Sequence, residues 1–496
     1  MPPQRHDYHD EEEEEELLYD MNKLDHPVGG GIRHHSEDDD EFIYNQDDAP
    51  LLTDDDHTGS TRASKRGGWF TTLRQKIPNF RLSSPSSSIQ KQSSSRQRPP
   101  RKCCCCRLSL CLIITALMTV AFFIWSLFYF SPATLPEPTV PDKSTNTDAR
   151  FLTLNIFMRP PGVKNNKSDY KEQRLDYIIK YILPHYDVIT IQEAFAFANR
   201  RIDTLQVAAR ELGFNYQVAS PRHYPWQLAA DGGLLLLSRF PIATSNVLEF
   251  PRGLHSDWLS KKGTLHALIE LNEHRSVHLY TTHTQASYDS NGQLNQDDTD
   301  MRLSQFALVH QFISDTARED GSPIMIMGDL NVDASKHDLP KTAHAVHSSD
   351  AYIKMVQILN GTGLPDGTYK DSWHIDTMKD VVYEQFGYHP VTFGNIITTN
   401  TTSSQREGEE KKEEEEEEGI IPAETVLTHW DQQTTVQSID RIFWADRFSK
   451  TITVNNITIE KFLIADNDQL TEEERKDIEF TQISDHYGMS CRVELI

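Results

Sequence analysis

The sequence has few cysteines for its length, and their placement excludes a fold held together by disulfides. Six cysteines occur in 496 residues. Four of them are consecutive at positions 103–106, Cys111 lies in an apolar run, and Cys491 stands alone near the C-terminus. This pattern excludes a small disulfide-stapled secreted module and a cysteine-rich zinc site.

Long stretches of the chain have few or no charged residues of one sign. The net charge of −25 is therefore a sum over acidic and basic segments. Residues 1–60 carry 20 acidic and three basic side chains, whereas residues 61–107 carry 12 basic side chains and no acidic one. Residues 406–418 hold nine glutamates against three basic residues. Once these contributions of −17, +12 and −6 are removed, the rest of the chain carries −14. This acidic remainder argues against a basic groove for nucleic acid.

Apolar residues are scarce in the first part of the chain, which excludes a packed core there. Residues 11–16 are all glutamate, and residues 83–101 are mostly serine, glutamine, proline and basic residues. Such segments cannot bury enough apolar surface to fold. We therefore predict a disordered tail over 1–107, acidic and then basic; a docking arm that is acidic or phosphorylated is the alternative.

Charge is absent from residues 108–130, LSLCLIITALMTVAFFIWSLFYF. A helix of this length spans about 30 Å of hydrocarbon. Trp125 and Tyr129 lie where interfacial aromatic residues are expected. The alternatives are a buried core helix and a signal peptide, but the segment is far from the N-terminus and lacks a polar face. The pattern predicts one transmembrane helix over 108–130.

The residues that flank this helix predict its orientation. Arg98, Arg101, Lys102 and Arg107 precede it, and the next basic residue is Lys143. The positive-inside rule then gives a single-pass type II protein with a cytosolic N-terminus and its C-terminal part in a lumen or outside the cell. Residues 103–106 suit S-palmitoylation, with an unmodified cysteine cluster as the alternative. The downstream sequons are compatible with a lumenal domain; they begin at Asn166, Asn360, Asn400 and Asn456.

Short β-branched runs alternate with helical patterns from residue 149 onward. FLTLNIF, DVITIQ and PIMIMGD read as strands, and residues 303–312 have helical spacing. This texture predicts an α/β domain over 149–496, with two sheets stacked face to face under outer helices. Residues 131–148 form a proline-rich, semi-rigid linker. Residues 399–419 form a low-complexity insertion.

Candidate polar groups stand mainly at strand ends: Asn155, Glu193, His283, Asp329, Asn331, Asp440, Asp485 and His486. Taken singly, an Asp or Asn there is explained as a turn former, and a His as a structural residue. Taken together they suit other chemistry. Glu193 and Asn155 offer oxygen ligands for a hard divalent cation. A His next to an Asp, with another Asp on a nearby strand, suits a base that activates water.

The motifs NIF, QE, THTQ, GDLN, SIDRIF and SDH occur in this order between residues 155 and 486. Their order resembles the endonuclease/exonuclease/phosphatase superfamily, which implies a four-layer α/β sandwich like that of pancreatic deoxyribonuclease. Residues 231–242 resemble the "GLxxxSRxPI" strand and turn of neutral sphingomyelinases. Lys262-Gly263 resembles their "KG", and residues 282–286 resemble their "THxQA".

The resemblance implies a cation site and a set of catalytic residues. Glu193 would be the main Mg²⁺ ligand, with Mn²⁺ as an alternative cation, Asn155 close beside it, and Asp485 as a neighbouring ligand or a support for the metal's water shell. Lys261 or Lys262 is a weaker candidate, because loop lysines are usually solvated.

The same resemblance assigns the reaction steps. His486 would take a proton from the attacking water, and Asp440 would orient the His486 ring. Asp329 would position that water, Asn331 would hydrogen-bond a phosphoryl oxygen, and His283 would stabilise the developing charge or protonate the leaving alkoxide.

The implied function is a membrane-anchored, Mg²⁺-dependent phosphodiesterase. Its partner would be sphingomyelin or a related phosphosphingolipid in a bilayer, and its products ceramide and a phosphorylated head group. A nuclease or a phosphoinositide phosphatase of the same superfamily is the alternative. A membrane scaffold that has lost catalysis is a third hypothesis, from a different class of protein. Nucleic acid is disfavoured by the acidic charge of the domain.

Overall fold

The structure is a computed structural model, and it describes residues 104–288, 295–337, 343–363, 373–375, 378–399, 419–430, 432–447 and 450–496. Residues 1–103 of the predicted disordered tail lie outside these ranges, and so do residues 400–418 of the insertion predicted over 399–419. Residues Thr115–Ile496 belong to one compact unit, whereas residues before Thr115 in the described part belong to another. The site and the sheets all lie in the unit that contains Thr115–Ile496.

The predicted membrane segment forms one helix, α2, over Cys104–Tyr129. The helix begins four residues before the start of the predicted span and ends one residue before the end of that span. Part of the cysteine run is therefore helical. Within the described part of the chain, Ser109–Tyr129 is the one stretch of helix long and apolar enough to cross a membrane, by length and composition. Its large side chains are mostly exposed, unlike those of a core helix.

The first six-stranded sheet has the order β17-β18-β1-β2-β4-β3. Strands β1 and β2 are parallel, and β18 pairs antiparallel with β1. The bounds are β1 Asp148–Met158, β2 Val188–Ala194, β3 Tyr216–Ala219, β4 Leu235–Ser238, β17 Ile452–Glu460 and β18 Gly488–Leu495. The predicted strands FLTLNIF and DVITIQ are β1 and β2.

The second six-stranded sheet has the order β10-β16-β8-β7-β6-β5. Strands β7 and β8 are parallel, and β16 runs antiparallel to β8. The bounds are β5 Ile242–Glu249, β6 Gly263–Asn272, β7 Arg275–His283, β8 Ile324–Asp329, β10 Lys379–Asp380 and β16 Asp440–Ala445. Three short pairs complete the described strands: β9 His344–Ala345 with β11 His389–Pro390, β12 Phe393–Gly394 with β15 Val436–Gln437, and β13 Ile396–Thr399 with β14 Gly419–Pro422.

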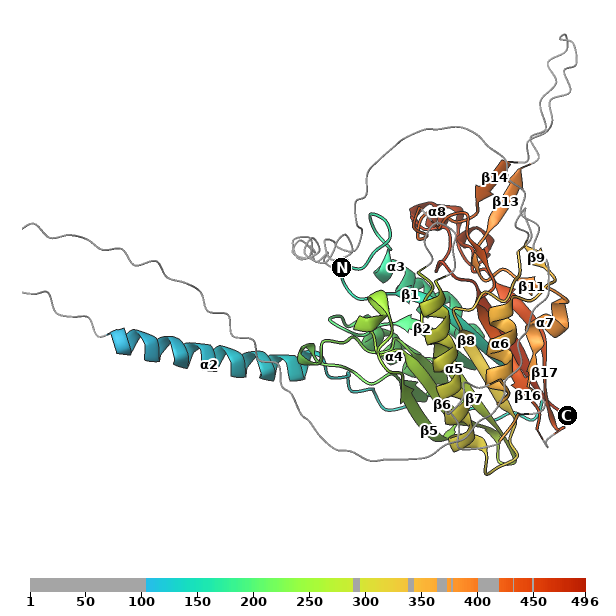
Figure 1. The fold of residues 1–496 in the computed structure, drawn as a ribbon, viewed down its shortest axis with the longest axis horizontal. Helices are drawn as coiled ribbons and strands as arrows, with labels where there is room; N and C mark the ends of the chain where they lie inside the picture. Colours follow the sequence, from blue (N-terminus) through green and yellow to red (C-terminus); the bar gives the residue numbers. More distant parts are fainter. Residues whose placement is uncertain are drawn as a thin grey trace, which may run out of the picture. The chain divides into compact units, whose positions relative to one another are not determined.

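Helices α3 to α6 lie against the outer faces of the two sheets (Figure 1). The first sheet is covered by α3 Lys171–Tyr177, which continues into η2 Ile178–Ile182 and η3 Leu183–His185, and by α4 Arg201–Glu211. The second sheet is covered by α5 Gln296–Ala317 and α6 Asp350–Leu359. The smaller helices are η4 Pro225–Gln227, η5 His255–Leu259, α7 Val381–Phe386, η6 Ile464–Asp466 and α8 Glu472–Asp477.

Alternation along the strands builds the layers, because successive side chains of a strand point to opposite faces. In β8, Met325 and Met327 join the apolar cluster between the two sheets, whereas Ile324 and Ile326 pack against α5 and α6. In β1, Phe151 faces the other sheet and Leu152 faces the helices. The predicted mixed α/β fold is confirmed, and its layers run helices, sheet, sheet, helices.

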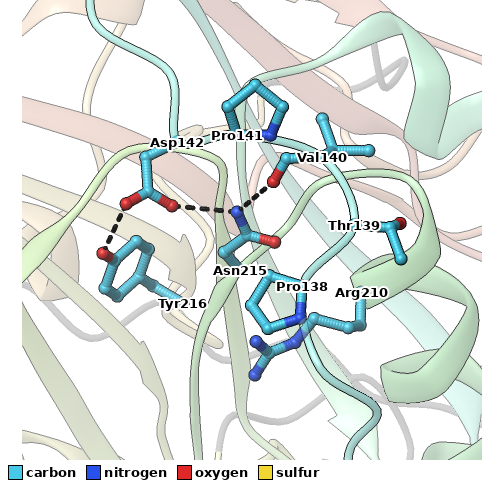
Figure 2. Close-up of a pocket in the computed structure, with 8 residues that line it drawn as sticks. All are labelled: Pro138, Thr139, Val140, Pro141, Asp142, Arg210, Asn215 and Tyr216. Atoms are coloured by element: carbon cyan, nitrogen blue, oxygen red, sulfur yellow. Dashed lines mark hydrogen bonds between the residues drawn. The ribbon is translucent and has the colours of Figure 1, made fainter.

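The linker over 131–148 packs along the folded unit. The backbone N–H groups of Lys143 and Thr145 donate to the carbonyls of Arg239 and Leu271, each at 2.9 Å. The amide of Asn215 donates to the Val140 carbonyl at 2.8 Å and to Asp142 at 2.9 Å. Figure 2 shows the pocket of about 570 Å³ that this segment forms beside Asn215. The linker is therefore docked on the surface.

A buried histidine pair lies on the helix-covered face of the second sheet. His266 in β6 and His278 in β7 stack, with His266 Nε2 2.8 Å from His278 Nδ1. Asp320 lies 2.8 Å from His278 Nε2 and Asn246 3.2 Å from His266 Nδ1. Burial and the neighbouring His278 lower the pKa of His266 from 6.5 to about 3, and burial also lowers the pKa of His278.

The histidine pair predicts that the free energy of unfolding decreases as the pH is lowered. Because the unfolded chain protonates His266 near pH 6.5 and the folded chain near pH 3, the free energy of unfolding is highest above pH 6.5 and decreases toward pH 3. The contribution approaches about 1.4 kcal/mol per pH unit for one group. Urea unfolding between pH 4.5 and 7.5 should show a shallower acid slope for His266→Phe. The control is His274→Phe, at an exposed residue of the β6–β7 turn; an unchanged slope in His266→Phe would contradict the assignment.

Candidate functional site

The candidate groups meet where strands of both sheets end. His283 closes β7, Asp329 closes β8 and Asp440 opens β16, and the strand register places Asp329 beside both of the others. Asn155 lies in β1 and Glu193 in β2 of the other sheet. Parallel strands bring their carboxyl ends to one edge. The fold therefore brings groups from two sheets to one location.

Backbone strain marks two of these strand ends. Glu193 and Asn331 adopt left-handed backbone angles, with φ of 53° and 50°. Such conformations cost free energy in residues other than glycine and are concentrated at functional sites. Gly328 is required for a different reason: a Cβ at this position would lie 2.4 Å from the Thr282 carbonyl oxygen. The glycine of the GDLN motif lets β8 approach β7 closely just before Asp329.

The amide of Asn155 connects the site across the two sheets. Its Nδ2 lies 3.0 Å from Asp329 Oδ2, 3.2 Å from Glu193 Oε1 and 3.4 Å from His486 Nε2. The Phe157 backbone N–H donates to Asn155 Oδ1 at 3.0 Å, which requires the oxygen to point that way. Asn155 therefore presents its nitrogen, not its oxygen, to the carboxylates. In this structure it supports the site instead of offering an oxygen ligand.

His486 is held by two aspartates in the buried part of the site. Its Nδ1–H donates to Asp440 Oδ2 at 2.9 Å, and its Nε2 lies 3.7 Å from Asp329 Oδ2. Burial opposes protonation, but the charges of Asp440 and Asp329 outweigh it and raise the pKa of His486 to about 10. The Phe393 ring packs 4.8 Å from the imidazole. These contacts fix the orientation of the ring and keep a proton on Nδ1.

His283 is buried beside a lysine. Lys262 Nζ donates to His283 Nε2 at 3.2 Å, to the Thr284 carbonyl at 2.9 Å and to Asp257 at 2.8 Å. Burial and the charges of Lys262 and His486 lower the pKa of His283 well below 6.5, so it is neutral. The expectation of a solvated loop lysine is wrong for Lys262, which is 6% exposed because three acceptors surround its ammonium group. Asn331 donates to the same Thr284 carbonyl at 3.0 Å.

The donor set fits a hard divalent cation. Glu193 Oε2 is buried and has no hydrogen-bond partner among the described residues. Burial and the negative charge of Glu193 raise the pKa of the nearby Asp485 to about 7. Asp485 is buried and Glu193 is half-buried, and their charges repel each other. A cation with oxygen ligands would stabilise such a pair.

A second acidic group lies close by. One ligand atom each from Asp329, Asp440 and His486 lie within 4.8 Å of one another, and all three residues are buried. His486 Nδ1 already donates to Asp440, however, and a nitrogen that carries this proton cannot bind a metal. The hydrogen bond therefore makes His486 and Asp440 better suited to proton transfer than to metal binding.

The comparison with known families agrees with this geometry. The sequence profile of the endonuclease/exonuclease/phosphatase family matches residues 152–486. The chain belongs to this family. The matched range includes Asn155, Glu193, Asp329 and Asp440 and ends at His486.

Within the family the chain is sphingomyelinase-like. It is 28% identical to a sphingomyelinase from Dictyostelium discoideum over 417 residues, which cover 74% of this chain and 84% of the relative. It is 25% identical to sphingomyelinase C from Bacillus cereus over 228 residues, 44% of this chain and 65% of that protein. The crystal structure of β toxin from Staphylococcus aureus superposes with a TM-score of 0.45 at 19% identity, covering 69% of this chain and 99% of the toxin.

Sequence reasoning missed one supporting residue of this family member, Arg174 in α3. Arg174 is fully buried and donates to the carbonyls of Asp169, Ile156, Phe157 and Ile483 at 2.6–2.8 Å. It thus ties the end of β1, just after Asn155, to the loop just before Asp485. A charged residue in a helical pattern reads as solvent-facing, so the sequence held no signal for this role.

The contacts of Arg174 predict that its substitution impairs the site, although Arg174 is not itself a candidate site residue. Arg174→Met keeps much of the side-chain volume but leaves four buried carbonyls without their donor, and each unsatisfied group costs about 1–3 kcal/mol. We expect a loss of several kcal/mol in unfolding free energy, measured by urea unfolding, and weaker binding of a divalent cation by calorimetry. Arg210→Met, on the partly exposed side of α4, is the control. Wild-type values for Arg174→Met would contradict this role.

Proposed function

We propose that this chain is a membrane-anchored, Mg²⁺-dependent phosphodiesterase that hydrolyses sphingomyelin or a related phosphosphingolipid. Its products would be ceramide and a phosphorylated head group. The observation that carries the proposal is the buried pair of His486 and Asp440, which faces Asp329 beside the carboxylates of Glu193 and Asp485. The similarity to sphingomyelinases supports the choice of substrate class.

Glu193 and Asp485 would hold the cation, and Asn155 would keep Glu193 in place through its amide nitrogen. When bound, Mg²⁺ would polarise a phosphoryl oxygen and offset the charge of the transition state; Mn²⁺ could serve in the same role. His486 acts as a base only in its neutral form, so it must first release the proton that its pKa of about 10 retains. His486 Nε2 would then be free to accept a proton.

The remaining residues divide the reaction among them. His486 would take the proton of the attacking water, while Asp440 holds its ring and stabilises the imidazolium that forms. Asp329 would position the water and Asn331 would donate to a phosphoryl oxygen. Neutral His283, with no described hydrogen-bond partner at Nδ1, would donate to the oxygen that gains charge; its depressed pKa favours this over protonation of the leaving group.

The membrane anchor is part of the proposal. The apolar stretch Ser109–Tyr129 would span the bilayer with the basic segment on the cytosolic side, which places the family domain in a lumen or outside the cell. A sphingolipid substrate in the same bilayer suits such an enzyme. An outward-facing site disfavours phosphoinositides, and the acidic domain disfavours nucleic acid.

A substrate panel tests the function directly. The purified full chain should release a phosphorylated head group from sphingomyelin vesicles in Mg²⁺ and lose this activity in EDTA. Inositol phosphosphingolipid, phosphoinositides and single-stranded DNA complete the panel. Glu193→Gln, which removes one ligand charge, should need a higher Mg²⁺ concentration, whereas Glu211→Gln, on the exposed face of α4, should not. Preferential cleavage of DNA would favour a nuclease, and no hydrolysis of any phosphoester would favour the scaffold hypothesis.

His486 predicts the largest loss of turnover. His486→Ala removes the proton acceptor, and a general base contributes about 10²–10⁴-fold to rate. We expect a decrease of that size in kcat on sphingomyelin, with Mg²⁺ binding retained by calorimetry and the fold retained by circular dichroism. His274→Ala is the control at an exposed histidine. Near-normal hydrolysis by His486→Ala would rule out this residue as the base.

A further inference from the structure

Two neighbouring loops expose a cluster of large apolar side chains. Trp226 and Leu228, in and after η4, are 41% and 67% exposed, and Trp258 and Leu259 of η5 are 47% and 53% exposed. We call these four residues the apolar loop surface. Exposed apolar groups that gather in one place mark binding surfaces.

Arginine and backbone hydrogen bonds hold the two loops together. The Arg252 guanidinium donates to the carbonyls of Gln227, Leu228 and Trp258 at 2.6–3.0 Å. It also lies 4.1 Å from the centre of the Trp258 ring. The Ala230 N–H donates to the Leu259 carbonyl at 2.7 Å. The apolar loop surface is therefore a built feature that presents both tryptophans on one framework.

The apolar loop surface continues into the apolar helix α2. The Trp226 ring lies 5.0 Å from the ring of Phe123, which is inside the stretch Ser109–Tyr129. Phe123 precedes Tyr129 by six residues, or about 9 Å of helix. If Ser109–Tyr129 crosses a bilayer, Trp226 therefore lies near the boundary between hydrocarbon and head groups, where tryptophan is enriched.

The end of α2 is also fixed to the folded unit. Arg200 donates to the carbonyls of Tyr129 and Ser131, each at 3.0 Å, and the Tyr129 carbonyl is one that the helix end leaves open. The Tyr129 hydroxyl donates to the Ala198 carbonyl at 3.2 Å. The Phe130 and Phe197 rings pack 5.2 Å apart. These contacts hold the apolar loop surface beside the last turns of α2.

The same loop leads to the candidate active site. Asp257, the residue before Trp258, accepts hydrogen bonds from Lys262 and from the Ala286 N–H, both at 2.8 Å. Lys262 in turn contacts His283 at 3.2 Å. Only Asp257 separates the exposed Trp258 from the Lys262–His283 pair along this path. Insertion of Trp258 into lipid would therefore bring the site to the bilayer surface.

We propose that the apolar loop surface inserts into the bilayer that α2 crosses and holds the active site against the lipid head groups. The proposal rests on the membrane anchor of the proposed function. The occupant of the surface is lipid, because Trp226 contacts a residue of the apolar stretch itself. Insertion would serve catalysis on lipid in a membrane and would be dispensable for a soluble phosphodiester.

Tryptophan quenching measures insertion independently of activity. The full chain is placed in vesicles that contain lipids brominated along their acyl chains, which quench nearby tryptophans. Trp226→Phe with Trp258→Phe should remove a lipid-quenched part of the fluorescence. Trp430→Phe, at a residue 74% exposed, should remove fluorescence that lipid does not quench. The fluorescence of the removed tryptophans is the difference between the parent chain and each variant. If lipid quenches this difference equally for both variants, the proposal is overturned.

Activity on two substrates measures what the surface does. Trp226→Ser with Leu228→Ser should lower hydrolysis of vesicle sphingomyelin by about 10-fold, as expected when two apolar side chains no longer leave water. Hydrolysis of soluble p-nitrophenyl phosphocholine should stay within about 2-fold, because neither residue contacts the site. The control pair is Val346→Ser with Ile353→Ser, two residues that are 50% and 44% exposed.

Three results would overturn the proposal: unchanged hydrolysis of vesicles, an equal loss on both substrates, or a loss that accompanies a smaller oligomeric mass. The last would mean that a second copy of the chain covers the surface. If the parent chain hydrolyses neither substrate, the proposed function fails, and the quenching measurement still decides whether the surface enters lipid.

Discussion

The amide of Asn155 is the contact on which the arrangement of the site depends. It lies in β1 of one sheet and donates toward Asp329 at the end of β8 in the other, while also reaching Glu193 and His486. Its two N–H groups serve two carboxylates, Asp329 and Glu193, from a fully buried position, so small shifts between the sheets would break this set. The apolar cluster between the sheets holds their separation constant. Packing and site geometry are therefore one constraint in this family member.

The burial of several carboxylates in one region requires positive charges and hydrogen-bond donors in defined positions. Asp329, Asp440 and Asp485 are almost completely buried within one region, an arrangement that isolated carboxylates would not tolerate. His486 offsets the charge of Asp440 and Asp329, and burial still raises the pKa of Asp329. The positive charges of His486, Arg159 and Arg174 favour ionised Asp485, yet burial and Glu193 still raise its pKa to about 7. A cation there would complete the balance.

Much of the fold was predictable from periodicity and turn chemistry. FLTLNIF, DVITIQ and PIMIMGD are strands because alternating apolar residues suit two packed faces, and GDLN ends its strand because Gly328 permits a backbone approach that no Cβ allows. The order of the motifs indicated which polar residues belong together. It could not indicate that Lys262 is buried, or that Arg174 holds two loops, because both depend on acceptors supplied by distant segments. The orientation of the Asn155 amide likewise depends on a single backbone N–H, that of Phe157.

The docked linker has a consequence for where such an enzyme can work. Between the end of α2 and the start of β1, the Ala133 N–H donates to Asp203, and Val140, Lys143 and Thr145 are also hydrogen-bonded to the folded unit. Because these hydrogen bonds hold the linker along its length, the folded unit cannot move far from the end of α2 while they persist. In a membrane-spanning protein, a short linker held in this way confines the domain to the leaflet beside its own transmembrane helix. Turnover would then be supplied by lateral diffusion of lipids within that leaflet, and an apposed membrane would be out of reach.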